Sequence, residues 1–159
     1  MVLLSYPSVT AVAVEREERL LAEARRRAQE VGVADRVEWR AMDARDLDED
    51  GTFDTAFWSQ FFFPAGTRAA TLQVARHALK PGGYLVMPIL SDPPTTDEEM
   101  GTPSGRGYTV ERLIYGGWGI PALTAVQLQR EVQAAGFEVV DICDMGPGRA
   151  LVSQRPVGP

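Results

Sequence analysis

The chain has 159 residues, of which 45% are hydrophobic, and its 22 acidic and 16 basic residues give a formal net charge of −6. This length and composition are typical of one globular domain with a real core, and the acidic balance provides no basic face for nucleic acid or anionic lipid. A single cysteine and a single histidine exclude an internal disulfide framework and argue against a structural zinc site, so we expect no metal.

The first third of the chain predicts two strands with a helix between them. The opening MVLLSYPSV is apolar but lacks a charged leader and is too short to span a bilayer, so we expect a cytoplasmic protein without a membrane partner. Residues 9–14 are rich in β-branched side chains and predict a strand buried on both faces, which Glu15 closes. A helix with an apolar stripe follows, and Gly32 is placed to cap its end. Residues 37–41 predict the second strand.

The middle of the chain predicts a strand at 53–58, a helix at 67–79 and a further strand at 84–90. A Lys-Pro-Gly-Gly corner separates the last two elements, and it contains the only lysine, Lys80. Proline cannot continue a helix and glycine permits backbone angles that other residues avoid. We therefore expect a sharp helix-to-strand turn in which Lys80 faces the last helical carbonyls.

Residues 91–120 interrupt the pattern with a Pro/Gly/acidic loop and then an aromatic, glycine-rich stretch. Large rings on a glycine-hinged segment are suited to close over a flat substrate, so we expect a lid, with a simply packed loop as the alternative. A helix at 123–136 follows, and residues 137–145 and 149–156, joined through 146–148, predict an antiparallel pair. Alternating strands and helices predict an α/β fold with a parallel sheet covered on both faces.

Several motifs follow one another in the order and spacing of a known family: AVAVEREERLLAEARRRA, EWRAMDARDL, DGTFDTAFWSQ, ALKPGGYLVM and LQREVQAAGFEVVDI. Each motif is weak alone, and the Lys-Pro-Gly-Gly corner is the most distinctive. Together they make the chain resemble the class I S-adenosylmethionine-dependent methyltransferases. The resemblance implies a Rossmann-like, mostly parallel sheet flanked by helices, with an antiparallel C-terminal hairpin, in one methyltransferase domain spanning 1–159.

The resemblance starts after the family's first strand and the glycine-rich loop that ends it. In the family's strand order, 3-2-1-4-5-7-6, that strand is central, so we expect the centre of the sheet to be missing from this chain. Unpaired buried backbone groups cost about 1–3 kcal/mol each, against a total stability of about 5–15 kcal/mol. We therefore expect an N-terminally truncated domain that is marginally folded and binds its cofactor poorly.

The resemblance implies S-adenosyl-L-methionine as the cofactor. Glu15 matches the residue that accepts hydrogen bonds from both ribose hydroxyls, and a carboxylate suits a diol because it has two oxygens. Asp43 matches the acceptor of the adenine amino group, while Met42 is placed to pack on the adenine or in the core. A solvated charge at the start of a helix is the alternative for Glu15. The complete set of expected cofactor residues is Glu15, Arg16, Met42, Asp43, Ala44 and Ser59.

For the acceptor molecule we expect five residues, at the end of the third strand and in the predicted lid: Trp58, Gln60, Phe62, Tyr115 and Trp118. The alternative for the aromatic run at 61–63 is a core-facing cluster. We assign no catalytic residue, because attack on a sulfonium depends on alignment more than on acid–base chemistry. His77 lies beside the corner, away from the carboxyl ends of the strands, and Cys143 falls within a strand.

The expected function is methyl transfer to a small-molecule acceptor by in-line attack on the sulfonium. Two alternatives remain open: a fragment of an NAD(P)-dependent oxidoreductase, because an acid after the second strand also binds ribose there, and a non-catalytic remnant that serves as an interaction module. The expected partner is the small molecule, with no nucleic acid, and a homodimer is the alternative to a monomer.

Overall fold

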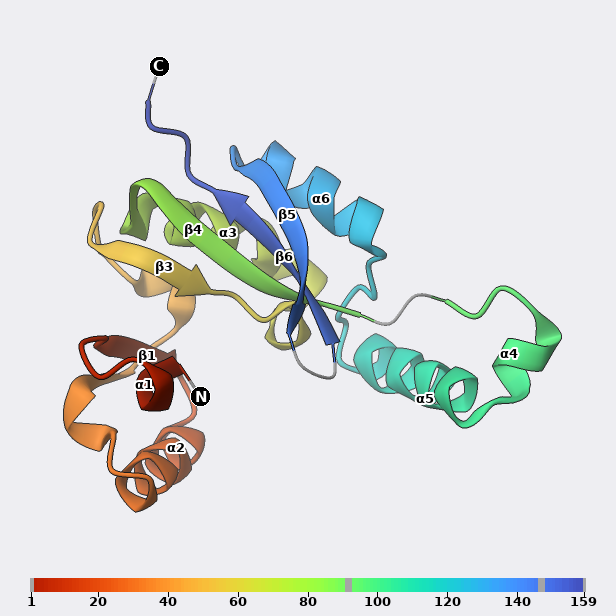
Figure 1. Ribbon diagram of the computed structural model, residues 1–159, viewed down its shortest axis with the longest axis horizontal. Coiled ribbons are helices and arrows are strands. Elements are labelled where there is room, and N and C mark those ends of the chain that lie inside the picture. Colours follow the sequence, from red (N-terminus) through yellow and green to blue (C-terminus); the bar gives the residue numbers. More distant parts are fainter. Residues whose placement is uncertain (1, 91–92, 146–147, 159) are drawn as a thin grey trace. The chain divides into compact units, whose positions relative to one another are not determined.

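Figure 1 shows the computed structural model, which describes residues 2–90, 93–145 and 148–158. The chain divides into two compact units, Met1–Leu47 and Asp48–Pro159, and each unit contains its own sheet. None of the helices in the described ranges is both long and apolar enough to cross a membrane. The single domain that we expected over 1–159 stays a prediction.

The first unit is a parallel pair of strands with one long helix. Its strands β1 (Ala11–Glu15) and β2 (Val37–Ala41) pair from Ala11 with Val37 to Glu15 with Ala41. Between them α2 (Glu18–Glu30) ends as predicted, with Gly32 in the left-handed region at φ 71°. The short elements of this unit are α1 (Val2–Ser5) and the 3₁₀ turns η1 (Ala34–Arg36) and η2 (Ala44–Asp46).

The second unit is a four-stranded mixed sheet in the order β3-β4-β6-β5. The β3–β4 pair is parallel, whereas β4–β6 and β5–β6 are antiparallel, so the predicted C-terminal hairpin is confirmed. Its residues 146–147, which we placed in the connecting turn, lie outside the described residues. The elements of this unit are β3 (Phe53–Phe57), η3 (Gln60–Phe62), α3 (Ala65–Ala78), β4 (Leu79–Ile89), α4 (Asp97–Gly101), α5 (Pro103–Gly117), α6 (Ala125–Ala134), β5 (Glu138–Met145) and β6 (Gly148–Gln154).

The strand orders of the two sheets agree with the order predicted from the family resemblance. The pair β2-β1 corresponds to strands three and two of that order, and β3-β4-β6-β5 corresponds to four, five, seven and six. The described strands therefore form two separate sheets, one in each unit. The α/β class and the strand neighbours within each sheet are therefore confirmed, with a parallel pair in the first unit and a mixed sheet in the second.

The core of the second unit lies between its sheet and the helices α3 and α6, which lie next to the sheet in Figure 1. Leu72 of α3 and Leu128 of α6 are fully buried against strand residues. This arrangement follows from the apolar stripes at helical spacing that the sequence showed. The fully buried strand side chains are Leu79, Leu85, Met87, Ala150, Leu151 and Ser153.

The Lys-Pro-Gly-Gly corner is a bulge within β4 rather than a turn before it. Leu79 pairs with Phe53 ahead of the corner and Tyr84 pairs with Thr55 after it, so four residues of β4 stand opposite one residue of β3. Our expectation for the lysine was also wrong, because Lys80 Nζ donates to Asp54 Oδ1 at 2.7 Å. The carbonyls at the end of α3 instead accept from the guanidinium of Arg155, which bonds the oxygens of residues 77 and 79.

The described part of the predicted loop, from residue 93 onward, is largely helical. Thr96 and Thr102 provide the reason, because their hydroxyls accept from the N–H groups of Glu99 and Gly105 and so cap α4 and α5. Pro103 occupies the first turn of α5, where a missing N–H costs nothing. Residues 91–92 of this insert lie outside the described residues.

Candidate functional site

The expected cofactor residues of the first unit gather at the carboxyl ends of β1 and β2. Glu15 is the last residue of β1, and its main-chain carbonyl accepts from the N–H of Met42 at 3.2 Å. Asp43 follows directly, at the start of the turn η2. Because parallel strands end at the same edge, the structure brings Glu15, Met42 and Asp43 together, while Ser59 belongs to the second unit and its place beside them stays a prediction.

The side chain of Glu15 is oriented by the helix that follows it. Its Oε1 accepts from the main-chain N–H of Glu17 at 2.9 Å, and Glu17 itself provides no side-chain cap for α2. A carboxylate offers about four lone-pair positions, so one bond to the backbone leaves acceptors for a diol. Glu15 is therefore a charge at the start of a helix that keeps free acceptor positions, and its contact with a ribose stays a prediction.

Asp43 is held as a carboxylate by Arg45. Its Oδ1 accepts from the main-chain N–H of Arg45 at 2.9 Å and from Nε at 3.0 Å, and its Oδ2 accepts from Nη2 at 2.7 Å. The side-chain bonds to Arg45, then its backbone N–H, and more weakly the charge of Arg16 keep the pKa of Asp43 well below its usual range. Asp43 is thus an acceptor at neutral pH, and Arg16 lies close enough to act on it.

The residues expected at the end of β3 are buried. Trp58, Ser59 and Gln60 are 4%, 7% and 0% exposed. The ladder to β4 continues through them, since the Trp58 N–H donates to Val86 O at 3.0 Å and the Gln60 side-chain amide donates to Pro88 O at 2.8 Å. The main chain of Trp58 and the side chain of Gln60 thus bind β4, and the contact of these residues with a cofactor or acceptor stays a prediction.

An aromatic cluster, defined as Phe61, Tyr115 and Trp118, joins the segment after β3 to the end of α5. The rings of Phe61 and Tyr115 stack with centroids 5.2 Å apart and an interplanar angle of 15°, and Trp118 meets Tyr115 edge-on at 6.2 Å. The Trp118 ring is 64% exposed, and the neighbouring Phe62 is 76% exposed. Burial, and secondarily the charge of Glu111, raises the pKa of Tyr115, so its phenol is neutral at physiological pH.

Two charged residues near this cluster were missed in the sequence. Arg68 is 2% exposed, and both its Nε and its Nη2 donate to the carboxylate of Glu131, at 2.7 and 2.5 Å. The signal was present in the spacing: Arg68 lies on the apolar stripe of α3 with Leu72, and Glu131 lies on that of α6 with Leu128. A charge of each sign at a core-facing helix position predicts a buried pair.

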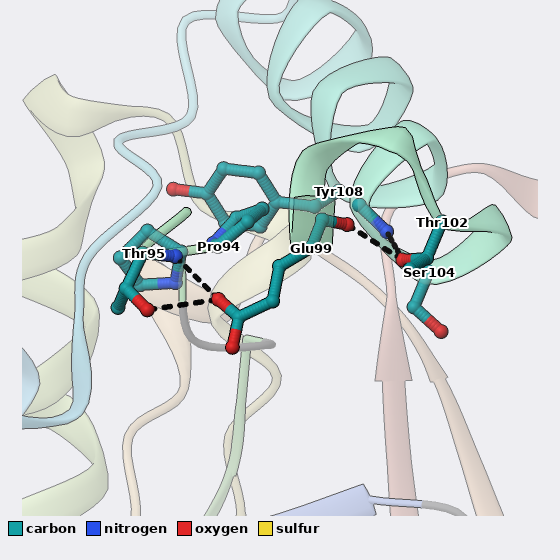
Figure 2. Close-up of a pocket in the computed structure, with 8 residues that line it drawn as sticks. Pro94, Thr95, Glu99, Thr102, Ser104 and Tyr108 are labelled. Carbon is teal, nitrogen blue, oxygen red and sulfur yellow. Dashed lines mark hydrogen bonds between the residues drawn. The ribbon is translucent and has the colours of Figure 1, made fainter. Parts of the chain in front are cut away.

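A cavity of about 400 Å³ lies within the insert, between the chain before α4 and the first turns of α5. Figure 2 shows the residues that line it. The carboxylate of Glu99 accepts from the N–H and the hydroxyl of Thr95 at 2.7 and 2.8 Å, which lowers the pKa of Glu99. None of the expected site residues contributes to this cavity. The lining residues are Pro93, Pro94, Thr95, Glu99, Thr102, Ser104, Gly105 and Tyr108.

The residues set aside in the sequence lie apart from these features. His77 is in the last turn of α3, with its Nδ1 3.7 Å from Asp50 Oδ1 and its side chain 59% exposed. Cys143 is a half-buried free thiol in β5. Across the described ranges, no group of three or more His, Cys, Asp or Glu side chains is arranged to hold a metal ion.

Comparison with known proteins gives a family and a fold. A family model described as a methyltransferase domain matches residues 2–83, which is just over half of the 159 residues. No curated protein sequence matches the chain. The chain is similar to the solved structure of an O-methyltransferase family 2 protein from Planctomyces limnophilus in complex with apigenin, with a TM-score of 0.77 and 21% identity over 97% of this chain and 45% of that one.

Two other solved structures support the same fold. Mitomycin 7-O-methyltransferase MmcR has a TM-score of 0.77 and 20% identity, over 97% of this chain and 44% of its own. A SAM-dependent methyltransferase from Methanosarcina mazei has a TM-score of 0.69 and 15% identity, over 99% of this chain and 87% of its own. The chain spans about half the length of most of the solved structures that it resembles. The motifs, the strand order and the family model agree, and the chain belongs to the class I S-adenosylmethionine-dependent methyltransferase family.

Proposed function

We propose that this chain forms part of an enzyme that transfers a methyl group from S-adenosylmethionine to a hydroxyl of a small, flat aromatic acceptor. Family membership supports methyl transfer in general. The aromatic cluster is the observation that carries the choice of acceptor, since stacked and edge-on rings, of which Trp118 is largely exposed, suit a planar ligand. Similarity to O-methyltransferases, one of them solved with apigenin, supports an oxygen acceptor.

The residues at the ends of β1 and β2 fit the adenosine part of the cofactor. Glu15 would accept from the ribose hydroxyls with the lone pairs that the Glu17 N–H leaves open. Asp43 would accept from the adenine amino group, because Arg45 keeps it ionised and oriented. Arg16, Met42 and Ala44 complete the proposed adenosine site. When bound, the cofactor supplies an electrophilic methyl group that an acceptor oxygen attacks in line.

Residues of the second unit would orient the acceptor. The exposed Trp118 and Phe62 rings would cover a flat ligand and exclude water, while Tyr115 is held in place by Phe61. This chain's contribution to rate is then alignment of the acceptor oxygen, which does not depend on a protein base of perturbed pKa. Family membership supports neither the nicotinamide alternative nor an interaction module.

The test is a methyl-transfer assay with labelled S-adenosylmethionine and a panel of phenolic acceptors, on the protein and on Trp118→Ala. We expect Trp118→Ala to raise the acceptor KM by about tenfold, equivalent to about 1.4 kcal/mol of binding, with the cofactor KM within about twofold of its original value. Val110→Ala is the matched control, because Val110 is also exposed on α5 but lies outside the aromatic cluster. Equal changes in the two KM values for Trp118→Ala would refute the acceptor assignment.

A further inference from the structure

Arg68 is a buried cation at the meeting point of α3, α6 and the segment that follows β3. We call residues 58–63 the post-β3 segment. The guanidinium binds Glu131 of α6 through two nitrogens, and its remaining terminal nitrogen, Nη1, donates to the main-chain carbonyl of Gln60 at 3.2 Å. One side chain thus connects two helices to the backbone at Gln60, just beyond the end of β3.

The same guanidinium also contacts the start of that segment. Its Cζ lies 4.8 Å from the centroid of the Trp58 ring, within the range of a cation–π interaction. Trp58 is in turn fixed by its Nε1 donating to Thr71 Oγ1 at 3.0 Å and by stacking on Phe63 at 4.7 Å with an angle of 8°. Arg68 therefore holds the segment at Trp58 and at Gln60, on either side of Ser59.

A pair that only joined α3 to α6 would need none of these additional contacts. Two nitrogens on the Glu131 carboxylate already satisfy the rule that a buried charge is paired. The bond to Gln60 O and the contact with the Trp58 ring require a planar cation with donors on several sides, which arginine has and lysine lacks. Both of these additional contacts are with the post-β3 segment, which contains Phe61.

We infer that Arg68 is a positioning residue for the acceptor site. By fixing the carbonyl of Gln60, it sets the backbone from which Phe61 projects and so places the Phe61 ring on Tyr115. Arg68 acts through the post-β3 segment and does not itself reach the acceptor. The expected change in the acceptor KM rests on the proposed function. The expected change in the order of the post-β3 segment does not depend on methyl transfer.

The experiment compares Arg68→Lys with Arg76→Lys in the intact protein. Arg76 is the matched control because it lies two turns further along α3 and its Nε donates to Gly136 O, just beyond α6, at 3.1 Å, rather than to the post-β3 segment. Amide hydrogen exchange is measured at residues 60–63 and across β4 and β6. Acceptor and cofactor KM values are measured in parallel.

We expect Arg68→Lys to raise exchange at 60–63 by about tenfold or more while the strands keep their protection. The acceptor KM should rise by about tenfold with kcat changed less than about threefold and the cofactor KM within about twofold. Arg76→Lys should leave the exchange at 60–63 and both KM values close to those of the original protein. Glu131→Gln, which keeps an oxygen acceptor for Arg68, should shift the same readouts in the same direction by about two- to fivefold.

The inference is overturned if Arg68→Lys has the same exchange rates and KM values as Arg76→Lys. It is also overturned if exchange rises throughout the sheet and both KM values change together, because Arg68 and Glu131 would then be a purely structural pair. If Arg68→Lys does not fold, an unaltered acceptor KM in Glu131→Gln overturns it. An original protein that transfers no methyl group would refute the proposed function alone, because the exchange comparison would still decide whether Arg68 positions the segment.

Discussion

The ammonium group of Lys80, the first residue of the bulge in β4, donates a hydrogen bond to Asp54, the one β3 residue that stands opposite the bulge. The distance from Lys80 Nζ to Asp54 Oδ1 is 2.7 Å. The two side chains are 48% and 84% exposed, so the pair contributes roughly 0–1 kcal/mol. Main-chain bonds hold the corner more firmly, since Gly82 N donates to Arg155 O and Arg155 N donates to Gly83 O, each at 2.8 Å. The shape of the corner is therefore a property of its backbone and its glycines.

This view predicts an order of effects for three substitutions at the corner. A Cβ on Gly83 would lie 2.9 Å from Lys80 O and 3.2 Å from Asp54 O, so Gly83→Ala should lower the free energy of unfolding by about 1–3 kcal/mol. Gly82 has a φ of 81°, so Gly82→Ala should cost about 1–2 kcal/mol. Lys80→Ala should cost less than about 1 kcal/mol. Urea denaturation measures all three, and a larger loss for Lys80→Ala than for Gly83→Ala would contradict the argument.

Glu15→Gln tests the proposed ribose contact. The substitution keeps an oxygen that can accept from the Glu17 N–H, so the start of α2 should stay intact while the charge-assisted bonds to a diol are lost. We expect the Kd for S-adenosylmethionine, measured by isothermal titration, to rise by about tenfold. Glu18→Gln, in the first turn of α2, is the control and should leave that Kd nearly unchanged. Equal effects of the two variants would show that only net charge matters.

The Asp43–Arg45 pair predicts a titration. Because bonds from Arg45 lower the pKa of Asp43, Arg45→Ala should bring it back toward the ordinary value of 3.8, as followed by carbon NMR of the Asp43 carboxyl group. A folded-state pKa below the unfolded value stabilises the protein above the unfolded pKa, and this contribution is lost as the pH falls through the folded pKa. Acid unfolding should therefore begin at a slightly higher pH in Arg45→Ala, by an amount that solvent screening keeps small.

A matched measurement on Arg27→Ala provides the control for that titration. Arg27 pairs with Glu23 on the exposed face of α2, away from the ends of the strands. Its removal should leave the titration of Asp43 unchanged. If the pKa of Asp43 stays low in Arg45→Ala, then Arg16 or the backbone, and not the Arg45 side chain, holds the charge.

Local patterns in the sequence predicted much of the fold. The strand at 37–41 and the helix end at Gly32 were found because side-chain alternation and a left-handed glycine are properties of neighbouring residues. The bulge at Lys80 was not predicted, because it depends on which β3 residues pair with Leu79 and Tyr84, and this pairing joins residues far apart in the chain. The region of α4 and α5 was predicted to be a loop because its prolines and glycines are typical of loops, and the two threonine caps were not recognised.

The candidate site was predicted to a different extent in each unit. Glu15 and Asp43 follow their strands directly, so strand order alone brings them to one edge. The ring stacking of Phe61 on Tyr115 joins residues far apart in the chain, and no local pattern encodes it. The burial of Trp58 follows from its contacts with Thr71 and Arg68, which only the packing of α3 provides.

The last prediction concerns two glycines of α5 that differ in their surroundings. A Cβ on the buried Gly105 would collide with Glu99 O and would lie 2.7 Å from Met100 Cα, so α4 and α5 meet through this missing side chain. Gly107, one half-turn further on, has no atom within 4 Å of the corresponding position. Alanine is a better helix former than glycine by about 1 kcal/mol, so helix propensity favours both substitutions equally and only the packing separates them.

We expect Gly107→Ala to slow amide exchange in α5, because the helix gains propensity at no steric cost. Gly105→Ala should do the opposite: overpacking by about 1–3 kcal/mol would push α4 away and speed exchange and proteolysis between residues 96 and 105. The sheet of the second unit should keep its protection in both variants, since the substituted helix end lies outside its core. Slower exchange in Gly105→Ala as well would mean that α4 and α5 do not pack through Gly105 in solution, and that the cavity of Figure 2 does not have this lining.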